Sequence, residues 1–184
     1  MIADNRTMAP RLDGWLPDPA VRVAHRRTSR ATPEELWKAA REIELAQTRM
    51  LGRLIRWRIP DMAPQTTFEG LFRNEPFAVL EEAERALVSG LVGRIWTLRR
   101  DYPVLVNPEE FREWSTPGTA KVLFAHWVEP DDATGSWLRS ETRVKAFGAQ
   151  GRVGLASVRP LISGFQNLVA SDAMAAAIRQ AERR

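Results

Sequence analysis

The chain has 184 residues, 44% hydrophobic and 27% charged, which is typical of one globular domain with a sizeable core and unlike a disordered chain. Cysteine is absent, which excludes disulfides, thiolate nucleophiles and thiolate metal sites. The net charge of +4 comes mostly from arginines spread among acidic residues, so no basic stripe indicates a nucleic-acid partner. No apolar run approaches the ~20 residues of a membrane span, and the N-terminus lacks the apolar core of a signal peptide. We therefore expect a cytoplasmic protein.

The first residues read as a separate arm. Residues 1–19 are expected to be loose, because four proline and glycine residues between positions 10 and 19 interrupt any helix or strand. Trp15 and Leu16 would pin this arm to the body. Residues 20–184 are expected to form a single domain that opens with a half-buried strand over 20–27, where apolar and polar residues alternate.

Two helices are predicted next. Thr32-Pro33-Glu34-Glu35 is a strong helix start, with Thr32 as N-cap, Pro33 at the first helical position and Glu35 completing a capping box. A second helix is predicted over 48–57, with three apolar residues on one side (Met50, Leu51 and Leu54) and three arginines on the other (Arg49, Arg53 and Arg56). The arginine side is interpreted as a solvated face, and a transient contact with an anionic membrane surface is the alternative. The segment from Pro60 to Phe72 has no assigned role.

The middle of the chain is rich in strand patterns. Residues 77–82 and 86–96 flank a short charged turn, as in a hairpin, and Gly90 and Gly93 permit a bend in the second arm. Residues 111–114 form a short alternating piece. The stretches 121–128 and 137–147 are predicted to be strands joined by a hairpin loop over 129–135.

In the last segment the spacing of the apolar residues changes from two to three or four. Apolar residues from Leu155 to Ala176 recur at steps of three and four, which predicts a long amphipathic helix. Pro160 lies inside this stripe and should kink the helix unless the helix begins there. With Gly164 one turn later, the kink suggests a hinge; the alternative is that Pro160 only marks a first turn.

Local sequence matches point to a family. The strand Val21–His25 followed by Ala31–Trp37, the segments 117–122 and 141–144, and the kinked terminal helix together resemble an uncharacterised bacterial branch of the START-like (SRPBCC) superfamily. That superfamily includes plant pollen-allergen-type proteins, lipid-transfer domains and aromatic polyketide cyclases. The resemblance implies an α+β helix-grip fold, with a curved antiparallel sheet wrapped around a long C-terminal helix and two shorter helices after the first strand.

The same resemblance implies a hydrophobic cavity between the sheet and the terminal helix. The residues expected to line it are Trp37, Trp96, Phe124, His126, Leu138, Thr142, Leu155, Ile162, Phe165 and Val169.

Standard catalytic and cofactor motifs are absent. No phosphate-binding glycine loop or Gly-x-Ser-x-Gly elbow occurs, and neither His25 nor His126 has a second ligand at metal spacing, so we expect no cofactor and no metal. His126 is the leading acid–base candidate, because it shares a strand face with apolar residues; a hydrogen-bonded core histidine is the alternative. His25 and Asp101-Tyr102 are further candidates that fit structural roles better.

Glu141 and Arg143 form a second candidate pair. They share one face of the strand 137–147, opposite the apolar face that holds Leu138 and Val144, which favours a solvent-facing charge ladder. The alternative places the pair inside, where it would bind a polar head group or stabilise an enolate. Only the strand register decides between the two.

Three functions remain open at this stage. The first is a carrier or sensor that binds a hydrophobic small molecule, such as a lipid, a polyketide-like compound or an aromatic compound. The second is a cyclase or dehydratase in which His126 or Arg143 acts on a substrate of that kind. The third is a protein-interaction module without a usable pocket. Ligand identity and oligomeric state do not follow from the sequence.

Overall fold

The computed structural model describes residues 9–48, 50, 51, 53, 63, 65–97, 101–131 and 135–183. Its centre is a five-stranded sheet, antiparallel throughout, with the strand order β1-β5-β4-β3-β2. The strands are β1 (Val21–Ser29), β2 (Ala78–Ala83), β3 (Ala86–Gly93), β4 (Ala120–Asp131) and β5 (Gly135–Ala146). The helices are α1 (Leu12–Trp15), α2 (Pro33–Glu42), η1 (Leu45–Gln47), α4 (Phe68–Arg73), α5 (Pro108–Glu113), α6 (Gly148–Leu168), η2 (Val169–Met174) and α7 (Ala175–Ala181).

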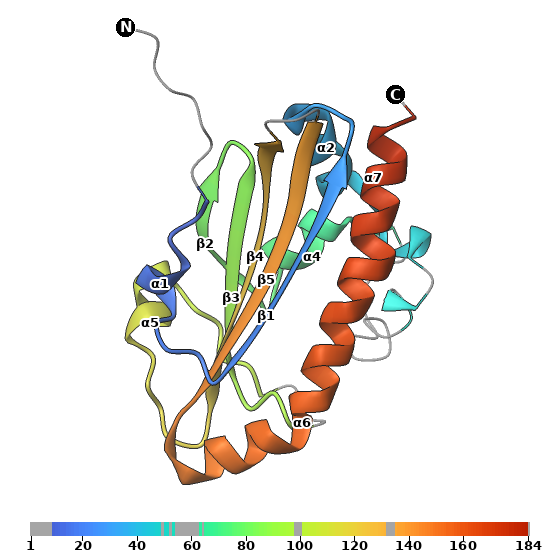
Figure 1. Ribbon diagram of the computed structural model, residues 1–184. Coiled ribbons are helices and arrows are strands. Elements are labelled where there is room, and N and C mark those ends of the chain that lie inside the picture. Colours follow the sequence, from blue (N-terminus) through green and yellow to red (C-terminus); the bar gives the residue numbers. More distant parts are fainter. Residues whose placement is uncertain are drawn as a thin grey trace, which may run out of the picture.

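The α+β helix-grip arrangement predicted from the sequence is confirmed. The elements α6, η2 and α7 form one continuous helix, Gly148–Ala181, which we call the terminal helix. It runs along one face of the curved sheet, whereas α1 and α5 lie beside each other on the opposite side (Figure 1). We call the face toward the terminal helix the inner face and the other the outer face.

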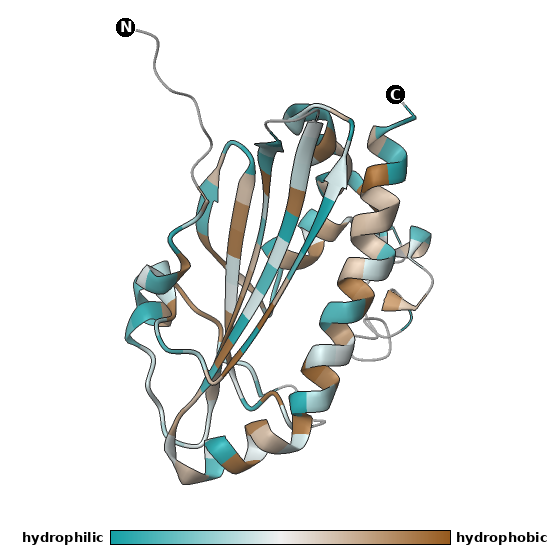
Figure 2. Cartoon of the chain, in the orientation of Figure 1, coloured by the Kyte–Doolittle hydropathy of each residue, from teal (hydrophilic) through white to brown (hydrophobic). Residues whose placement is uncertain are grey.

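Both faces of the central strands are covered. Every residue of β3 is buried, and β4 is buried from Ala120 to Val128. Such strands carry apolar residues on both sides, which explains the hydrophobic colouring along β3 in Figure 2. The edge strand β1 shows the alternating burial that its sequence predicts, because its outer face is largely open.

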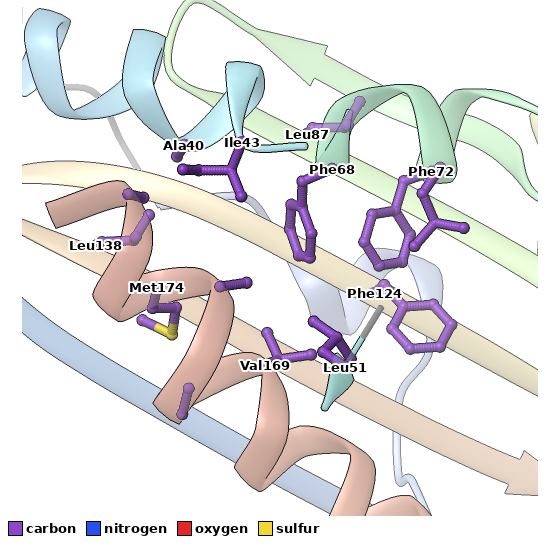
Figure 3. Close-up of a cluster of buried hydrophobic side chains, with 14 of the residues drawn as sticks. Ala40, Ile43, Leu51, Phe68, Phe72, Leu87, Phe124, Leu138, Val169 and Met174 are labelled. Carbon is purple, nitrogen blue, oxygen red and sulfur yellow. The ribbon is translucent and has the colours of Figure 1, made fainter. Parts of the chain in front are cut away.

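The inner core joins the sheet to α2, α4 and the terminal helix (Figure 3). Its centre is an aromatic group in which the Phe72 ring lies 5.0 Å from Phe68 and 5.2 Å from both Phe77 and Phe124, measured between ring centroids. Each edge-to-face or tilted pair of this kind stabilises the fold by about 0.5–1.5 kcal/mol beyond the hydrophobic contribution of the area it buries. The stretch around Phe68 to Phe72, which has no sequence-assigned role, thus helps to close the core.

Within residues 9–19 the chain packs against the sheet, where Trp15 and Leu16 pin it to the body as expected; residues 1–8 lie outside the described residues. Leu12, Trp15 and Leu16 are buried on the outer face. The Trp15 indole nitrogen donates a hydrogen bond to Glu81 Oε2 at 2.8 Å, and the Arg112 guanidinium lies 4.2 Å from the Trp15 ring centroid. The single helical turn of α1 fits between the prolines that were expected to exclude any helix.

Local signals explain the shorter helices. The capping box at Thr32 is present as predicted, since its side chain accepts from the Glu35 amide while Glu35 Oε2 accepts from the Thr32 amide at 3.0 Å. The prediction of a short, strand-like alternating segment at 111–114 is wrong, because Pro108–Glu113 is the helix α5. Its N-cap is Asn107, whose Oδ1 accepts from the Glu110 amide at 3.0 Å.

The terminal helix begins at Gly148, so Pro160 lies inside it. The helix changes direction along α6, in keeping with the predicted kink (Figure 1). Between α6 and α7 it widens into the π-helical turn η2, Val169–Met174. By length and composition this helix could cross a membrane, but core helices pass the same test, and here one side packs on the sheet.

Three further boundaries differ from expectation. Strands β4 and β5 extend into the predicted 129–135 loop and pair as far as Asp131 and Gly135. Of the predicted helix 48–57, only residues 48, 50, 51 and 53 are described; Leu51 is fully buried but Met50 is 63% exposed, so the two do not share a face. The expected cationic face of that helix lies mostly outside the described residues.

Candidate functional site

A small pocket lies at the inner face between α2, α4, β4 and the terminal helix. Its volume is about 30 Å³, and its walls include Trp37, Phe68, Phe72, His126 and Met174. Ligand pockets usually measure roughly 300–1,000 Å³, whereas one water molecule occupies about 30 Å³ of liquid. Among the described residues, this pocket therefore has room for about one water molecule and not for an organic ligand.

His126 is the polar group of this pocket. The residue is 6% exposed, and its imidazole lies 4.8 Å from the Phe68 and Phe72 ring centroids. Burial lowers the pKa of His126 from 6.5 to about 3, so the imidazole is neutral at physiological pH. Its Nε2 is buried without a hydrogen-bond partner. A neutral imidazole of this kind donates a hydrogen bond from one ring nitrogen and accepts one at the other, but it lacks the second, acidic proton of an imidazolium at pH 7.

His126 is one of three polar residues placed in line across the inner face. Ser140 of β5 is the register partner of His126 on β4 and also of His25 on β1. Side chains directly opposite one another on adjacent strands have Cβ atoms roughly 4.5–5.5 Å apart. His25 Nε2, Ser140 Oγ and His126 Nε2 are all buried without a hydrogen-bond partner. We call these three residues the polar row.

A second polar group lies on the same face, two residues further along the strands. Thr142, the register partner of Phe124, accepts a hydrogen bond from Gln166 of α6, and Gln166 Oε1 is buried without a partner. Ser89, opposite Phe124 on β3, also has a buried hydroxyl oxygen without a partner. Leaving a buried polar atom unpaired costs about 1–3 kcal/mol, and proteins keep few of them. Their concentration on one face is thus the most unusual feature of the interior.

A wider groove lies where β1 meets the terminal helix. It measures about 650 Å³, and its lining includes His25, Arg27, Trp137, Ile178 and Arg179. His25 belongs to both the groove and the polar row, whose other end, His126, lies in the pocket. Residues of the terminal helix line both spaces, so this helix lies between them. Burial, and then the charge of Arg27, lower the pKa of His25 from 6.5.

The pocket is closed at its side by an ion pair. Arg41 of α2 and Glu69 of α4 both line it, and Arg41 Nε lies 2.7 Å from Glu69 Oε2. Glu69 also contacts Arg73, whose Nε lies 2.7 Å from Glu69 Oε1. Burial opposes ionisation of Glu69, but the hydrogen bonds from both arginines outweigh it and lower the pKa of Glu69.

Of the ten residues expected to line a cavity, the structure brings three into the pocket: Trp37, His126 and Leu138. The others belong to the inner core or pack against it: Trp96, Phe124, Thr142, Leu155, Ile162, Phe165 and Val169. Trp96 lies elsewhere in the core, because its ring packs against Gly154 near the start of α6. Among the described residues, these seven side chains pack in the core and do not line the pocket.

Glu141 and Arg143 lie on the outer face, so the interpretation that places them in the cavity is wrong. They alternate with Leu138, Ser140 and Thr142, which face the inner core. They do not form a solvated ladder either, since Glu141 is 4% and Arg143 5% exposed.

The arm covers this pair and adds partners to it. Arg143 Nε lies 2.6 Å from Glu141 Oε1, and the same guanidinium bonds the carboxylate of Asp13 and, at 3.2 Å, the carbonyl oxygen of Leu16. Arg22 Nε donates to Glu141 Oε1 at 2.9 Å. The four-charge group therefore fastens the arm to the sheet.

Sequence reasoning missed several residues of the candidate site. Alternation puts Ser140 on the same face as Leu138 and Val144, but it was not singled out, although a serine on a buried strand face is itself a signal. Gln166 interrupts the apolar stripe of the terminal helix in the same way and is fully buried. Arg27 and Arg179 of the groove come from opposite ends of the chain, so no local pattern connects them.

Among the residues that the structure describes, no group of three or more histidine, aspartate or glutamate side chains is placed to hold a metal ion.

Comparison with known proteins adds little. No family model and no curated protein matches the chain. Three solved structures are similar: the hypothetical protein jhp0584 from Helicobacter pylori, protein MLL2253 from Mesorhizobium loti, and TTHA0849 from Thermus thermophilus. Their identities are 11%, 14% and 10%, and their TM-scores are 0.43, 0.34 and 0.30. The alignments cover 98%, 89% and 89% of this chain and 99%, 98% and 98% of the other chains. At these TM-scores the likenesses carry no argument about function.

Proposed function

We propose that this chain is a non-catalytic carrier or sensor of the START-like class, which binds a hydrophobic small molecule bearing a hydrogen-bonding group beneath its terminal helix. The polar row is the observation that supports this proposal. Three unpartnered polar atoms on neighbouring strands, set in an otherwise apolar face, lower the stability of the empty protein. A ligand that hydrogen-bonds to them relieves that cost, whereas a purely structural core gains nothing from them.

Binding requires the interior to open. The pocket of about 30 Å³ is too small for an organic ligand, so side chains must move. Met174 is well suited to this, because its unbranched side chain has several rotatable bonds and it ends the π-helical turn η2. π-Helical turns interrupt regular helical bonding and recur at functional sites.

The cyclase or dehydratase alternative has less support. A histidine whose pKa lies near 3 lacks the acidic proton of an imidazolium at neutral pH, and Arg143 lies on the opposite face of the sheet from the pocket. The interaction-module alternative is favoured by one observation, the small volume of the pocket that holds His126. A binding experiment separates it from the carrier proposal.

Two serines of β5 supply a matched pair of variants. Ser140 and Ser136 point to the same face and are 1% and 0% exposed. Ser136 Oγ donates to the Ala31 carbonyl oxygen at 2.9 Å, whereas Ser140 Oγ has no partner. Ser140→Ala should therefore raise the free energy of unfolding by about 1 kcal/mol and weaken ligand binding about fivefold, while Ser136→Ala should lower the free energy of unfolding by about 1 kcal/mol and leave binding unchanged.

The test combines native mass spectrometry of gently purified full-length protein with titration of N-phenyl-1-naphthylamine, a neutral apolar fluorophore with one N–H donor. An excess mass that leaves on denaturation, or saturable probe binding weakened only by Ser140→Ala, supports the proposal. A clean mass together with no saturable probe binding overturns it and leaves the interaction-module alternative.

A further inference from the structure

The groove between β1 and the terminal helix has the size and the two-sided chemistry of a ligand site. Its volume of about 650 Å³ lies within the range of small-molecule pockets. One wall is apolar and comes from the helix, with Ala170, Ala175 and Ile178. The opposite wall is the strand segment from His25 to Thr28.

The charged groups of this groove all have the same sign. Arg26, Arg27 and Arg179 line it, and none of its lining residues in the described part of the chain is acidic. Arg26 is already engaged, because its guanidinium stacks 4.8 Å from the Trp137 ring centroid. Arg27 and Arg179 are exposed, and within the described part of the chain neither forms an ion pair. Both guanidiniums are therefore available to an incoming anion.

The nearest acid along the helix does not neutralise them. Glu182 follows Arg179 by three residues, but its Oε1 accepts hydrogen bonds from the Arg30 amide at 2.9 Å and from Ser29 Oγ at 3.1 Å. These bonds from the Arg30 backbone and the Ser29 side chain lower the pKa of Glu182 and hold its carboxylate at the end of β1. The groove thus keeps its positive charge at neutral pH.

We propose that Arg27 and Arg179 bind the carboxylate of an amphipathic acid, whose apolar part lies against the helix wall of the groove. This inference rests on the proposed function and names the class of ligand. Guanidinium groups match a planar carboxylate with two parallel hydrogen bonds, which favours this head group over a neutral one. The Ile178 side chain offers apolar surface beside the charges.

The polar row extends from the groove toward the interior and offers hydrogen-bonding atoms to a ligand that enters from the groove. His25 lies in the groove with an unpartnered Nε2, and Ser140 and His126 follow it across the inner face. The occupant is a single dissolved molecule rather than a membrane, because the arginines line a recess whose apolar wall is one helix side. A membrane would require a broad exposed apolar face beside them.

The experiment compares two probes that differ only in the head group, dodecanoate and dodecanol. Each displaces N-phenyl-1-naphthylamine from the full-length protein at pH 7.5, with dodecanoate kept below its micelle concentration. We expect dodecanoate to bind at least about tenfold more tightly than dodecanol. Arg27→Gln and Arg179→Gln should each weaken dodecanoate binding about 5- to 10-fold and leave dodecanol binding unchanged. Arg159→Gln, an exposed arginine of α6 outside the groove, should change neither.

Equal affinities for the two probes, with no effect of either groove variant, overturn the carboxylate inference while leaving the proposed function intact. Failure of both probes to displace a fluorophore that itself binds saturably also overturns the carboxylate inference, whereas the proposed function is decided separately by the native mass and the fluorophore titration. Association of the protein with anionic vesicles, without binding of monomeric dodecanoate, also overturns the inference in favour of a membrane surface.

Discussion

Replacing His126 by phenylalanine should stabilise the protein and weaken ligand binding. The change keeps a ring against Phe68 and Phe72, which lie 4.8 Å away, and the adjoining space of about 30 Å³ accommodates the slightly larger side chain. It removes Nε2, a buried atom without a partner, whose burial costs about 1–3 kcal/mol. After allowing for some overpacking, we expect a gain of about 1 kcal/mol in the free energy of unfolding at pH 7.5.

The gain should grow at lower pH, because the pKa of His126 falls from 6.5 to about 3 on folding. Between these values the unfolded chain binds more protons than the folded one, so wild-type stability is complete above pH 6.5 and is lost progressively as the pH falls toward 3. The variant lacks this loss. From pH 7.5 to pH 5 the advantage of His126→Phe over wild type should therefore increase by about 2 kcal/mol.

Urea unfolding at both pH values measures this difference, provided that the m-value is unchanged. Other charged residues that line the pocket, Arg41, Glu69 and Arg139, are present in both proteins, so their titration cancels in the comparison. A difference that stays constant with pH would show that His126 is solvated in the folded state. A loss of stability at pH 7.5 would show that its imidazole makes a favourable interaction, and would remove the main support for the polar row.

Two further predictions concern buried charges of the outer face. Arg143→Met should lower the free energy of unfolding in urea by about 3 kcal/mol. The reason is that the buried Glu141 carboxylate keeps only the exposed Arg22 as a guanidinium partner. A loss below about 0.5 kcal/mol would contradict the role of Arg143 in fastening the arm. Burial, and then the charge of Lys145, lower the pKa of Lys121 from 10.5 to about 8, so the unfolded chain binds more protons between these values. Wild-type stability relative to Lys121→Met should accordingly rise by about 1 kcal/mol from pH 7.5 to pH 9.5, and no rise would indicate that the amine is solvated.

The sequence predicted helices well where a cap or a long stripe of apolar residues was present, and poorly where only a few alternating residues were considered. Thr32-Pro33-Glu34-Glu35 and Asn107-Pro108-Glu109-Glu110 follow the same pattern of N-cap, proline and acidic residues, and both begin helices. Only the first was recognised, because residues 111–114 alternate as a strand would. A cap is a local hydrogen-bonding signal, whereas four alternating residues fit either structure.

The orientation of the strands was predictable in part. Alternation placed Ser140 and Thr142 opposite Glu141 and Arg143, and the apolar neighbours indicated which set faces the core. It did not indicate that residues from the arm would bury the charged set, because that contact joins Asp13 to Arg143 across 130 positions. Burial of a polar residue depends on what covers it, and the covering segment here has no pattern of its own.

Cavity volume is the property least accessible from the sequence, and it is the one on which the function depends. The same apolar residues produce a wide cavity or a filled core according to how far the helix lies from the sheet and which rotamers its side chains adopt. Phe68 and Phe72, from a segment with no sequence-assigned role, contribute the rings that close the pocket around His126. A chain selected only for a filled core would replace His126 and Ser140 with apolar residues, because their unpaired atoms oppose folding. Under the proposed function, these atoms become paired in a second arrangement in which the ligand is bound.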